Sequence, residues 1–283
     1  MLYVATVHYA SPDWIDIQTR HLREQIGVPL EIWTSLEGID DSYGDRFDRV
    51  IDQFGRHSDK LNHLAIEIAH EAAPDDLLMF LDGDAFPIAD PMPLISDGLA
   101  RAPLLAVRRA ENLGDRQPHP CFCVTTVGTW RGLSGDWSAG YRWQNSEGRQ
   151  VTDVGGNLLR QLELSDTPWV EVLRSNRKDL DPVFFGVYGD VVYHHGAGFR
   201  AQEFTRAHSA QKPRPSGSTT TPLLGAMRRA MQRRRRQAWA EEVRTRQLEH
   251  SERIYREILA GETAWLGELM GEDAPLAVQH PPG

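Results

Sequence analysis

Cysteine and long hydrophobic runs are both scarce in this chain of 283 residues. Its only cysteines are Cys121 and Cys123, which excludes a disulfide scaffold and a cysteine-rich zinc site. No run of about 18 apolar residues is present, so we expect no membrane-spanning helix. The N-terminal stretch lacks a basic region and a cleavage site and does not read as a signal peptide. These absences favour a cytoplasmic protein in a reducing compartment.

The two cysteines stand one residue apart in a stretch rich in strand-forming residues. In an extended strand, side chains at this spacing point the same way but bridge poorly. We therefore interpret Cys121 and Cys123 as a buried pair of small apolar residues rather than a redox pair.

Positive charge is concentrated in one late segment. The formal net charge is -9, and 40% of the residues are hydrophobic, enough for a real core. Residues 206–236 hold nine of the 31 basic residues and none of the 40 acidic ones, which leaves 22 basic and 40 acidic residues, or -18, elsewhere. An acidic body argues against nucleic-acid binding and suits a protein that recruits cations.

Short apolar runs alternate with segments whose apolar residues recur at helical spacing along the first 200 residues. Residues 77–81 form a continuous apolar run, which is typical of a strand buried on both faces. The pattern predicts an α/β domain with a mixed, mostly parallel sheet and right-handed crossovers. The expected strands are 2–7, 30–34, 49–53, 77–81, 104–107, 121–127, 170–173 and 191–193, and the expected helices are 12–25, 58–71, 129–143, 154–162, 222–259 and 263–270.

Composition divides the chain into three parts. The α/β domain is expected to cover 1–206, a flexible linker rich in Ser, Thr and Pro 207–221, and a helical tail with basic and acidic stretches 222–283. The basic segment Arg228–Arg236 is a candidate for peripheral contact with an anionic inner membrane face. Its alternatives are a solvated helix face or an intramolecular partner for Glu241, Glu242 and the acidic body. The long amphipathic tail is also a candidate for homo-oligomer formation.

Two aspartates separated by one glycine follow the most apolar strand directly. Side chains of an extended Asp82-Gly83-Asp84 triplet point the same way, so both carboxylates can address one cation. Ligands of open α/β sheets bind beyond the carboxyl ends of strands, and carboxylates suit Mg²⁺ or Mn²⁺. The alternative is an ordinary surface turn, since Asp and Gly are common turn residues. The preceding buried strand favours the metal site.

The stretch HSDKLNHLAIEIAHEAAPDDLLMFLDGDAFPI resembles the region before and through the DxD motif of GT-A-fold glycosyltransferases. The resemblance implies a single Rossmann-like nucleotide-diphospho-sugar transferase domain over about residues 1–205. It implies a hexosyltransferase whose Asp82 and Asp84 hold Mn²⁺ or Mg²⁺ on a nucleotide-diphosphate sugar, with UDP or GDP favoured over dTDP. The acceptor would be a carbohydrate, a lipid-linked molecule or a small molecule.

A second element, VVYHHGAGFR, is similar to the late strand-plus-histidine motif of glycogenin-like members of this family. There the pattern is His, two residues, Gly, two residues and Lys. The resemblance implies that His194 or His195 is a metal ligand, and it places Arg200 at the lysine position, on the diphosphate. Gly196 stands one place early, and the usual Lys-Pro-Trp ending is missing, so the choice between the two histidines stays open.

Further residues gain roles from the same resemblance. It places Lys60 near the donor diphosphate or sugar and Thr6 and His8 near the nucleotide. An inverting enzyme needs a carboxylate to deprotonate the acceptor hydroxyl. Asp153 is the candidate, with Asp136 as a weaker substitute; the alternative for Asp153 is a helix N-cap. Four aromatic residues between the motifs are core residues or an acceptor platform, with at least two expected in the core: Trp130, Trp137, Tyr141 and Trp143.

Two other functions fit parts of the sequence. A haloacid-dehalogenase-type phosphatase also has Asp-x-Asp after a buried strand and would use Asp82 as its nucleophile. That motif normally opens the domain, whereas Asp82 follows several elements, and no convincing later Lys and acidic pair is present. The third hypothesis is a non-catalytic module whose basic tail binds a partner.

Overall fold

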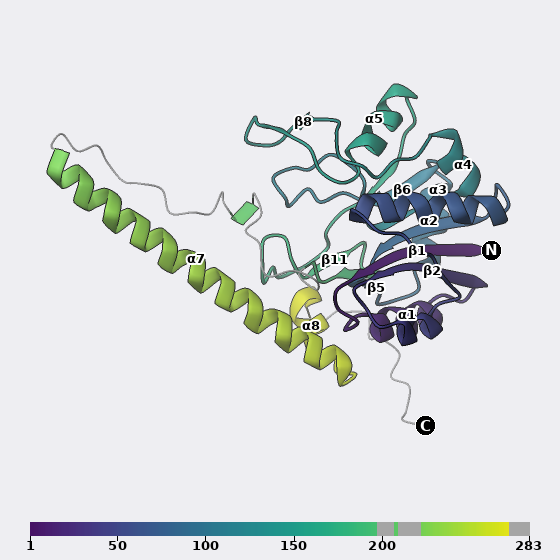
Figure 1. The fold of residues 1–283 in the computed structure, drawn as a ribbon, viewed down its shortest axis with the longest axis horizontal. Coiled ribbons are helices and arrows are strands. Elements are labelled where there is room, and N and C mark those ends of the chain that lie inside the picture. The colour runs from purple at the N-terminus through teal and green to yellow at the C-terminus, as the bar shows by residue number, and fades with distance from the viewer. Residues whose placement is uncertain (197–206, 209–221, 272–283) are drawn as a thin grey trace.

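The structure is a computed structural model that describes residues 1–196, 207–208 and 222–271, without the side chains of 222–230. A seven-stranded sheet forms its centre, with the strand order β10-β6-β7-β4-β1-β2-β3 (Figure 1). Its strands are β1 (Leu2–Tyr9), β2 (Leu30–Glu37), β3 (Arg49–Val50), β4 (Leu77–Asp82), β6 (Leu104–Val107), β7 (His119–Thr126) and β10 (Val170–Val172). β7 is antiparallel to β4 and β6, and the other pairs are parallel. The predicted mixed, mostly parallel α/β sheet is confirmed.

Helices cover both faces of this sheet, because its strands are apolar on both sides. In β4, Met79 and Leu81 face one core with α1 and α3, whereas Leu78 and Phe80 face the other with α2, α4 and α5. This alternation is the period of two that a pleated strand imposes. The helices are α1 (Ile15–Gln25), α2 (His57–Glu71), α3 (Met92–Leu99), α4 (Val127–Gly132) and α5 (Gly156–Leu164), with a short 3₁₀ helix, η1, at Asp41–Arg46.

Two small sheets accompany the central sheet. β5 (Ala85–Pro87) follows the aspartate pair directly and pairs antiparallel with β12 (Val192–His194), which also pairs with β11 (Gly186–Tyr188). β8 (Trp143–Gln144) and β9 (Gln150–Val151) form a separate two-stranded ribbon. The strand expected over 191–193 is β12, shifted by one residue, whereas β5, β8, β9 and β11 were not predicted, because strands of two or three residues carry little periodicity. The pairing of β5 with β12 nevertheless brings residues 84 and 195 together across more than a hundred positions.

The two cysteines are buried and free, as predicted, but they do not share a face. Cys121 packs into the core with α1 and α3, and Cys123 into the core with α2. The expectation of a common face was wrong because the β6–β7 ladder is irregular: Ala106 pairs with Cys123, whereas Val107 pairs with His119. A register shift of this kind breaks the strict alternation of side chains.

The C-terminal helices share a core with the α/β body. α7 (Pro222–Leu259) extends far from the body in its first half, and α8 (Ala264–Met270) turns back beside its last turns (Figure 1). Ile254 and Ile258 of α7 and Trp265 of α8 are buried against Phe86 of β5 and Tyr193 of β12. The end of the helical tail is therefore part of the folded domain.

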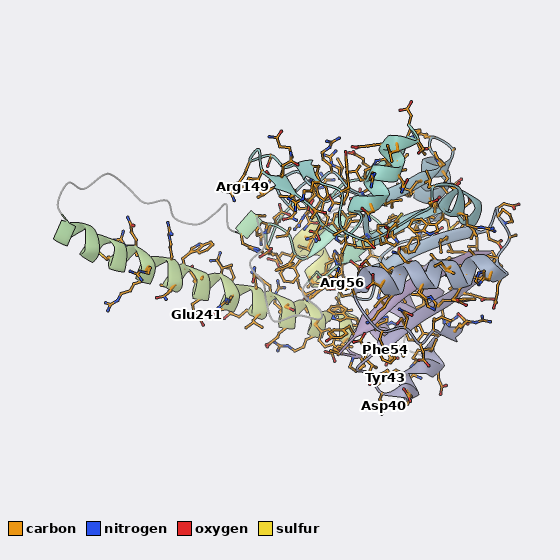
Figure 2. All side chains as sticks on the ribbon, turned by 45° about the horizontal axis from the view of Figure 1, so that its top comes forward. Asp40, Tyr43, Phe54, Arg56, Arg149 and Glu241 are labelled. Atoms are coloured by element: carbon orange, nitrogen blue, oxygen red, sulfur yellow. The ribbon has the colours of Figure 1, made fainter. Side chains whose placement is uncertain are left out.

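The outer part of α7 is highly charged. Arg233, Arg234, Arg235 and Arg236 are exposed, and so is Glu241, whose side chain is labelled on this helix in Figure 2. None of the described helices is long and apolar enough to cross a membrane.

Ala207 and His208, the first residues of the predicted linker, are buried, and residues 209–221 lie outside the described part.

Candidate active site

The predicted aspartate pair lies at the carboxyl end of β4, in the middle of the sheet. Asp82 is the last residue of β4 and stands opposite Val7 of β1 in the parallel ladder. Asp84 precedes β5, and its carbonyl accepts a hydrogen bond from the His195 amide at 3.0 Å. The antiparallel pairing of β5 with β12 places His194 opposite Ala85. The two sequence motifs, 110 residues apart, thus meet at one sheet edge.

Both carboxylates contact the same imidazole. His194 Nε2 lies 3.3 Å from Asp84 Oδ1 and 3.5 Å from Asp82 Oδ2. The side chains of Asp84 and His194 are only 6% and 5% exposed, and that of Asp82 is 14% exposed. The structure therefore assembles a nearly buried cluster of two carboxylates and one imidazole.

Two further histidines adjoin this cluster, and sequence reasoning missed both. His57 is the first residue of α2, and its Nε2 lies 3.0 Å from Asp82 Oδ1. His119 is the first residue of β7, and its Nδ1 lies 3.8 Å from Asp82 Oδ2. That Nδ1 accepts a hydrogen bond from the Cys121 amide at 3.1 Å, so the neutral ring carries its proton on Nε2.

The imidazoles keep the carboxylates ionised. Burial by itself would raise the pKa of Asp82, but the hydrogen bond and charge of His57, with a smaller contribution from His194, outweigh it and hold that pKa well below its usual range. For Asp84, burial is again outweighed, mainly by His194, and the pKa is also lowered. Burial lowers the pKa of His119 well below its normal value. The site thus presents ionised carboxylates beside a neutral imidazole.

Gln18 of α1 supports the loop between the two aspartates. Its Nε2 donates to the carbonyls of Asp82 and Ala85, both at 2.7 Å. Its Oε1 accepts from Thr6 Oγ1 at 2.9 Å and lies 3.1 Å from His8 Nε2. Thr6 and His8, the predicted nucleotide contacts, are completely buried and orient this glutamine. Burial lowers the pKa of His8 to about 4.

Gly83 is required at its position by close approach of the backbone. A Cβ there would lie 2.5 Å from the Val7 carbonyl oxygen and 2.9 Å from His8 Nδ1. Both distances are shorter than van der Waals contact, so a side chain would push the loop away from β1. The glycine allows the loop to lie flat against the end of the neighbouring strand.

His194 and His195, between which the sequence left the metal ligand open, have different surroundings. His195 Nδ1 hydrogen-bonds with the Tyr193 hydroxyl at 2.9 Å, and its Nε2 with Ser251 Oγ of α7 at 2.7 Å. The ring also packs against Trp14, with 4.5 Å between centroids. Both ring nitrogens of His195 thus have partners other than the aspartates, whereas the ring of His194 contacts both carboxylates.

Lys60 forms a buried ion pair. Its side chain is 2% exposed, and its Nζ lies 2.5 Å from Glu37 Oε2 at the end of β2. The ammonium also lies 5.2 Å from the centre of the Tyr9 ring. The hydrogen bond from Lys60 lowers the pKa of Glu37. Arg200, the predicted diphosphate ligand, lies outside the described residues.

The two candidate bases occupy different surroundings. Asp153 is exposed, its Oδ1 accepts a hydrogen bond from the Val154 amide, and the N-cap of α5 is Gly155. Asp136 accepts from the side chains of Asn62 and Asn157 and from the Ser138 amide, at 2.7–2.8 Å. Asp136 therefore cross-links three segments of the fold, whereas Asp153 is accessible.

Three of the four aromatic residues between the motifs belong to the core, in agreement with the prediction. Trp130, Trp137 and Trp143 are 5%, 0% and 2% exposed. Trp130 and Trp137 both pack against Phe80 of β4, with ring centroids 4.5 and 5.0 Å apart. Tyr141 is partly exposed, and its hydroxyl contacts Glu163. An acceptor platform made from this group would consist of Tyr141 alone.

The donor atoms of the cluster suit a divalent cation. Carboxylate oxygens favour Mg²⁺ and Mn²⁺, and imidazole is the commonest metal ligand in proteins. Within the described ranges, no group of three or more His, Cys, Asp or Glu side chains is arranged to hold an ion. His194 contacts Asp82 and Asp84 directly. An ion would take the place of these contacts.

Comparisons with known proteins give distant structural similarity only. No family model and no curated protein matches the chain. It is similar to the glycosyltransferase GlyE of Streptococcus pneumoniae (14% identity, 60% of this chain and 44% of that chain, TM-score 0.39). It is also similar to the galactosyltransferase LgtC in complex with donor and acceptor sugar analogs (12%, 57% and 70%, TM-score 0.35) and to S. aureus TarS 1-349 in complex with UDP (12%, 49% and 50%, TM-score 0.37).

These matches are partial. The chain spans 30% of one TarS chain and 50% of the TarS 1-349 chains. At identities of 10–15% and TM-scores of 0.33–0.39, the similarity carries no argument about activity. The functional assignment therefore has to come from the residues at the carboxyl end of β4.

Proposed function

We propose that the protein is a metal-dependent glycosyltransferase that moves a hexosyl unit from a nucleotide-diphosphate sugar, with UDP or GDP as the nucleotide, to an acceptor hydroxyl. One observation carries the proposal: at the carboxyl end of β4, His194 Nε2 of β12 lies within 3.5 Å of a carboxylate oxygen of both Asp82 and Asp84. This is where open α/β sheets bind their ligands.

Asp82, Asp84 and His194 are the residues that would hold Mn²⁺ or Mg²⁺, and the bound ion would neutralise charge on the donor diphosphate. His57 is a positioning residue, since its hydrogen bond orients the Asp82 carboxylate. Arg200 is assigned to the diphosphate. Thr6, His8 and Lys60 are assigned to the donor side, where Thr6 and His8 act through Gln18 and Lys60 is paired with Glu37. His195 anchors α7 in this scheme.

The transfer itself needs a base on the acceptor side. We assign this role to Asp153, whose carboxylate is exposed. The acceptor oxygen forms a bond to the anomeric carbon, the bond from that carbon to the diphosphate oxygen breaks, and the hydroxyl proton passes to the Asp153 carboxylate. The acceptor is a carbohydrate, a lipid-linked molecule or a small molecule.

Two properties of the tail belong to the same proposal. Arg233–Arg236 are exposed on the outer part of α7. Their exposure supports peripheral contact of the Arg228–Arg236 segment with the anionic, cytoplasmic face of the inner membrane. Homo-oligomer formation through the C-terminal helices would have to use this outer part. The apolar face around Ile254 and Ile258 is already covered by the protein's own body.

No observation favours the two alternative functions, a haloacid-dehalogenase-type phosphatase and a non-catalytic module. A phosphatase that uses Asp82 as its nucleophile needs an approachable carboxylate. The Asp82 side chain is only 14% exposed, and its Oδ1 is within hydrogen-bond distance of His57. A non-catalytic module would need no ionised pair of carboxylates at the sheet edge.

A thermal-shift titration tests the proposal. UDP, GDP and dTDP are added to the full chain with and without Mn²⁺. A ligand at about 100 times its Kd adds about 2.7 kcal/mol of stability. Manganese-dependent stabilisation by UDP or GDP is expected, together with its loss in Asp84→Ala and its weakening in His194→Ala.

Asp75→Ala and His70→Ala are the matched controls, since both side chains are exposed and lie outside the cluster. They should respond like the parent protein. Hydrolysis of a phosphate ester without nucleotide binding would support the phosphatase instead. If the parent protein shows neither nucleotide binding nor phosphate-ester hydrolysis, the result would support the non-catalytic module and overturn the proposal.

A further inference from the structure

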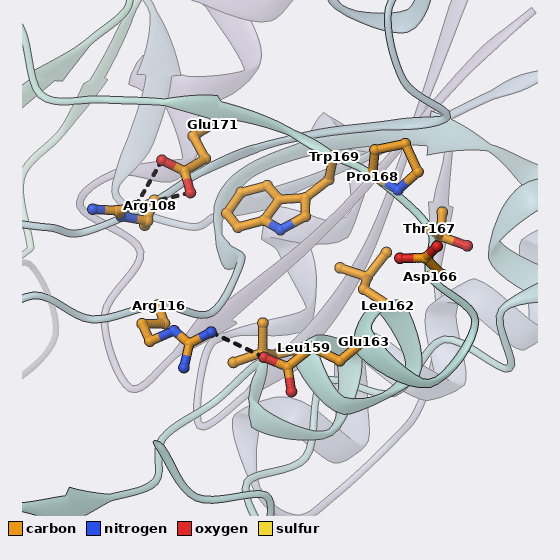
Figure 3. Close-up of a pocket in the computed structure, with 10 residues that line it drawn as sticks. All are labelled: Arg108, Arg116, Leu159, Leu162, Glu163, Asp166, Thr167, Pro168, Trp169 and Glu171. Carbon is orange, nitrogen blue, oxygen red and sulfur yellow. Dashed lines mark hydrogen bonds and ion pairs between the residues drawn. The ribbon is translucent and has the colours of Figure 1, made fainter. Parts of the chain in front are cut away.

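A cavity of about 310 Å³ lies between α5 and the edge strand β10 of the main sheet. It is separate from the aspartate pair. Arg108, at the end of β6, and Glu171, of β10, form one side, and Arg116 and Glu163 form another (Figure 3). Trp169 lines the cavity beside the Arg108–Glu171 pair. The volume of the cavity falls at the lower end of the range for small-molecule sites.

The charges that line the cavity compensate each other. Arg108 Nη1 donates to both oxygens of Glu171, at 2.8 and 2.7 Å, and Arg116 Nη2 donates to Glu163 Oε1 at 3.2 Å. With Asp166, the lining holds three carboxylates and two guanidinium groups. A phosphate or another polyanion would meet no unpaired positive charge there. The lining instead suits a neutral ligand with many hydroxyl groups, which can both donate to carboxylates and accept from guanidinium groups.

The remaining wall is aromatic and aliphatic. The indole of Trp169 is partly exposed and packs against the core that contains Leu162, which, with Leu159, also lines the cavity. A flat aromatic face beside hydrogen-bonding groups matches a sugar ring, which has an apolar C–H face and a polar rim. A small apolar ligand would leave the two ion pairs unused.

The chain connects this cavity to the aspartate pair. Arg108 and Arg116 both belong to the segment that joins β6 to β7, and His119, three residues after Arg116, lies 3.8 Å from Asp82. Three residues span at most about 11 Å. Because β6 and β10 run parallel to each other, and β6 and β4 are both antiparallel to β7, the carboxyl ends of β4, β6 and β10 share one edge. The segment between β6 and β7 therefore runs from the lining of the cavity to the aspartate pair.

We propose that this cavity binds a neutral saccharide, as a subsite for the non-reacting part of a carbohydrate acceptor. Trp169 supplies the stacking face, and the Arg108–Glu171 and Arg116–Glu163 pairs bind the hydroxyl groups. The acceptor role rests on the proposed function, whereas saccharide binding itself does not. The proposal narrows the acceptor to a carbohydrate.

Saturation-transfer-difference NMR on the full chain tests the inference, with lactose, maltose and cellobiose as probes. At least one of them is expected to bind. Trp169→Ala should weaken this binding by about fivefold or more, the effect of losing an aromatic face. Arg116→Ala removes a guanidinium group whose side chain is 56% exposed, and it should also weaken binding without disturbing the core.

Leu164→Ala is the matched control, because this leucine ends α5, is 69% exposed and does not line the cavity. It should bind the probe like the parent protein. Absence of binding by all three probes, or binding that survives both Trp169→Ala and Arg116→Ala, overturns the inference. Saccharide binding without a manganese-dependent nucleotide shift would keep the saccharide site and remove its acceptor role, so the two proposals fail separately.

Discussion

The side chain of Gln18 donates a hydrogen bond of 2.7 Å to the backbone carbonyl of Asp82. This contact joins α1 to the loop that carries the aspartate pair, across 64 positions of sequence. The same amide group also binds Ala85, Thr6 and His8, so one completely buried side chain links β1, β4, β5 and α1. The position of the carboxylates thus depends on a residue that is neither charged nor exposed.

Substitution of Gln18 by alanine should be strongly destabilising. It would leave two buried carbonyls, the Thr6 hydroxyl and the His8 ring with lost hydrogen bonds, each worth about 1 kcal/mol or more. We expect the free energy of unfolding, measured by urea denaturation, to fall by about 3 kcal/mol. Glu24→Ala, an exposed change on the same helix, is the control and should alter it by less than about 0.5 kcal/mol. Equal effects of the two changes would contradict the role given to Gln18.

Gly83→Ala should also destabilise the protein, through steric overlap. The new Cβ would meet the Val7 carbonyl oxygen at 2.5 Å and His8 Nδ1 at 2.9 Å, and such overpacking costs about 1–3 kcal/mol. Gly267→Ala is the matched control, because a Cβ at this position of α8 meets nothing within 4 Å. In a helix interior this change should stabilise the protein by about 0.5–1 kcal/mol. Thermal denaturation of both variants should give shifts of opposite sign, and a neutral Gly83→Ala would refute the close approach.

The long, strongly patterned elements of the fold were predictable from the sequence. The expected ranges 104–107 and 222–259 coincide with β6 and α7, and the buried run at 77–81 is β4 with one residue added. Burial on both faces explains this success, since continuous apolar runs have few other uses. The helix expected over 129–143 is only α4, Val127–Gly132, because the stretch after Gly132 packs its tryptophans without helical structure.

The cluster around the aspartates was predictable where a local motif carries its chemistry, as for the aspartate pair and His194. Asp82 and Asp84 stand together after a strand, which is a local signal. His57 and His119 reach Asp82 from the beginnings of α2 and β7, and nothing in their own surroundings distinguishes them from other polar residues at element ends. Their proximity follows from sheet order, in which β4 pairs with β7, and this order becomes visible only in three dimensions.

Stability should decrease in mild acid, with a measurable contribution from His21. Burial, followed by the charge of Arg20, lowers the pKa of His21 to about 4, despite the ring's hydrogen bond to the Pro87 carbonyl. In the unfolded chain the pKa is about 6.5, so below that pH the unfolded state binds more protons and unfolding becomes easier. The contribution of this one group is lost progressively from about pH 6.5 to about pH 4. At pH 5 it amounts to about 2 kcal/mol.

The measurement is the free energy of unfolding at pH 7 and pH 5 for the parent protein and His21→Gln. Glutamine has an amide that can still donate to the Pro87 carbonyl, but it does not titrate. The variant should therefore lose less stability between the two pH values than the parent. Some dependence remains, because burial also lowers the pKa of His8 to about 4 and that of His195 to about 3. An identical pH dependence of variant and parent would rule out His21 as a contributor.

The end of α7 should behave as part of the core of the α/β body. Ile254 is completely buried among residues of β5, β12 and α8, so Ile254→Ala should cost about 2–5 kcal/mol in urea denaturation of the full chain. Leu248, six residues earlier on the same helix, is 50% exposed, and Leu248→Ala should change stability by less than about 0.5 kcal/mol. A single cooperative transition that moves with Ile254→Ala is expected when fluorescence and circular dichroism are followed together. A separate early transition, with the main one unmoved, would mean that α7 unfolds independently and that its anchoring through His195 and Ser251 contributes nothing to the site.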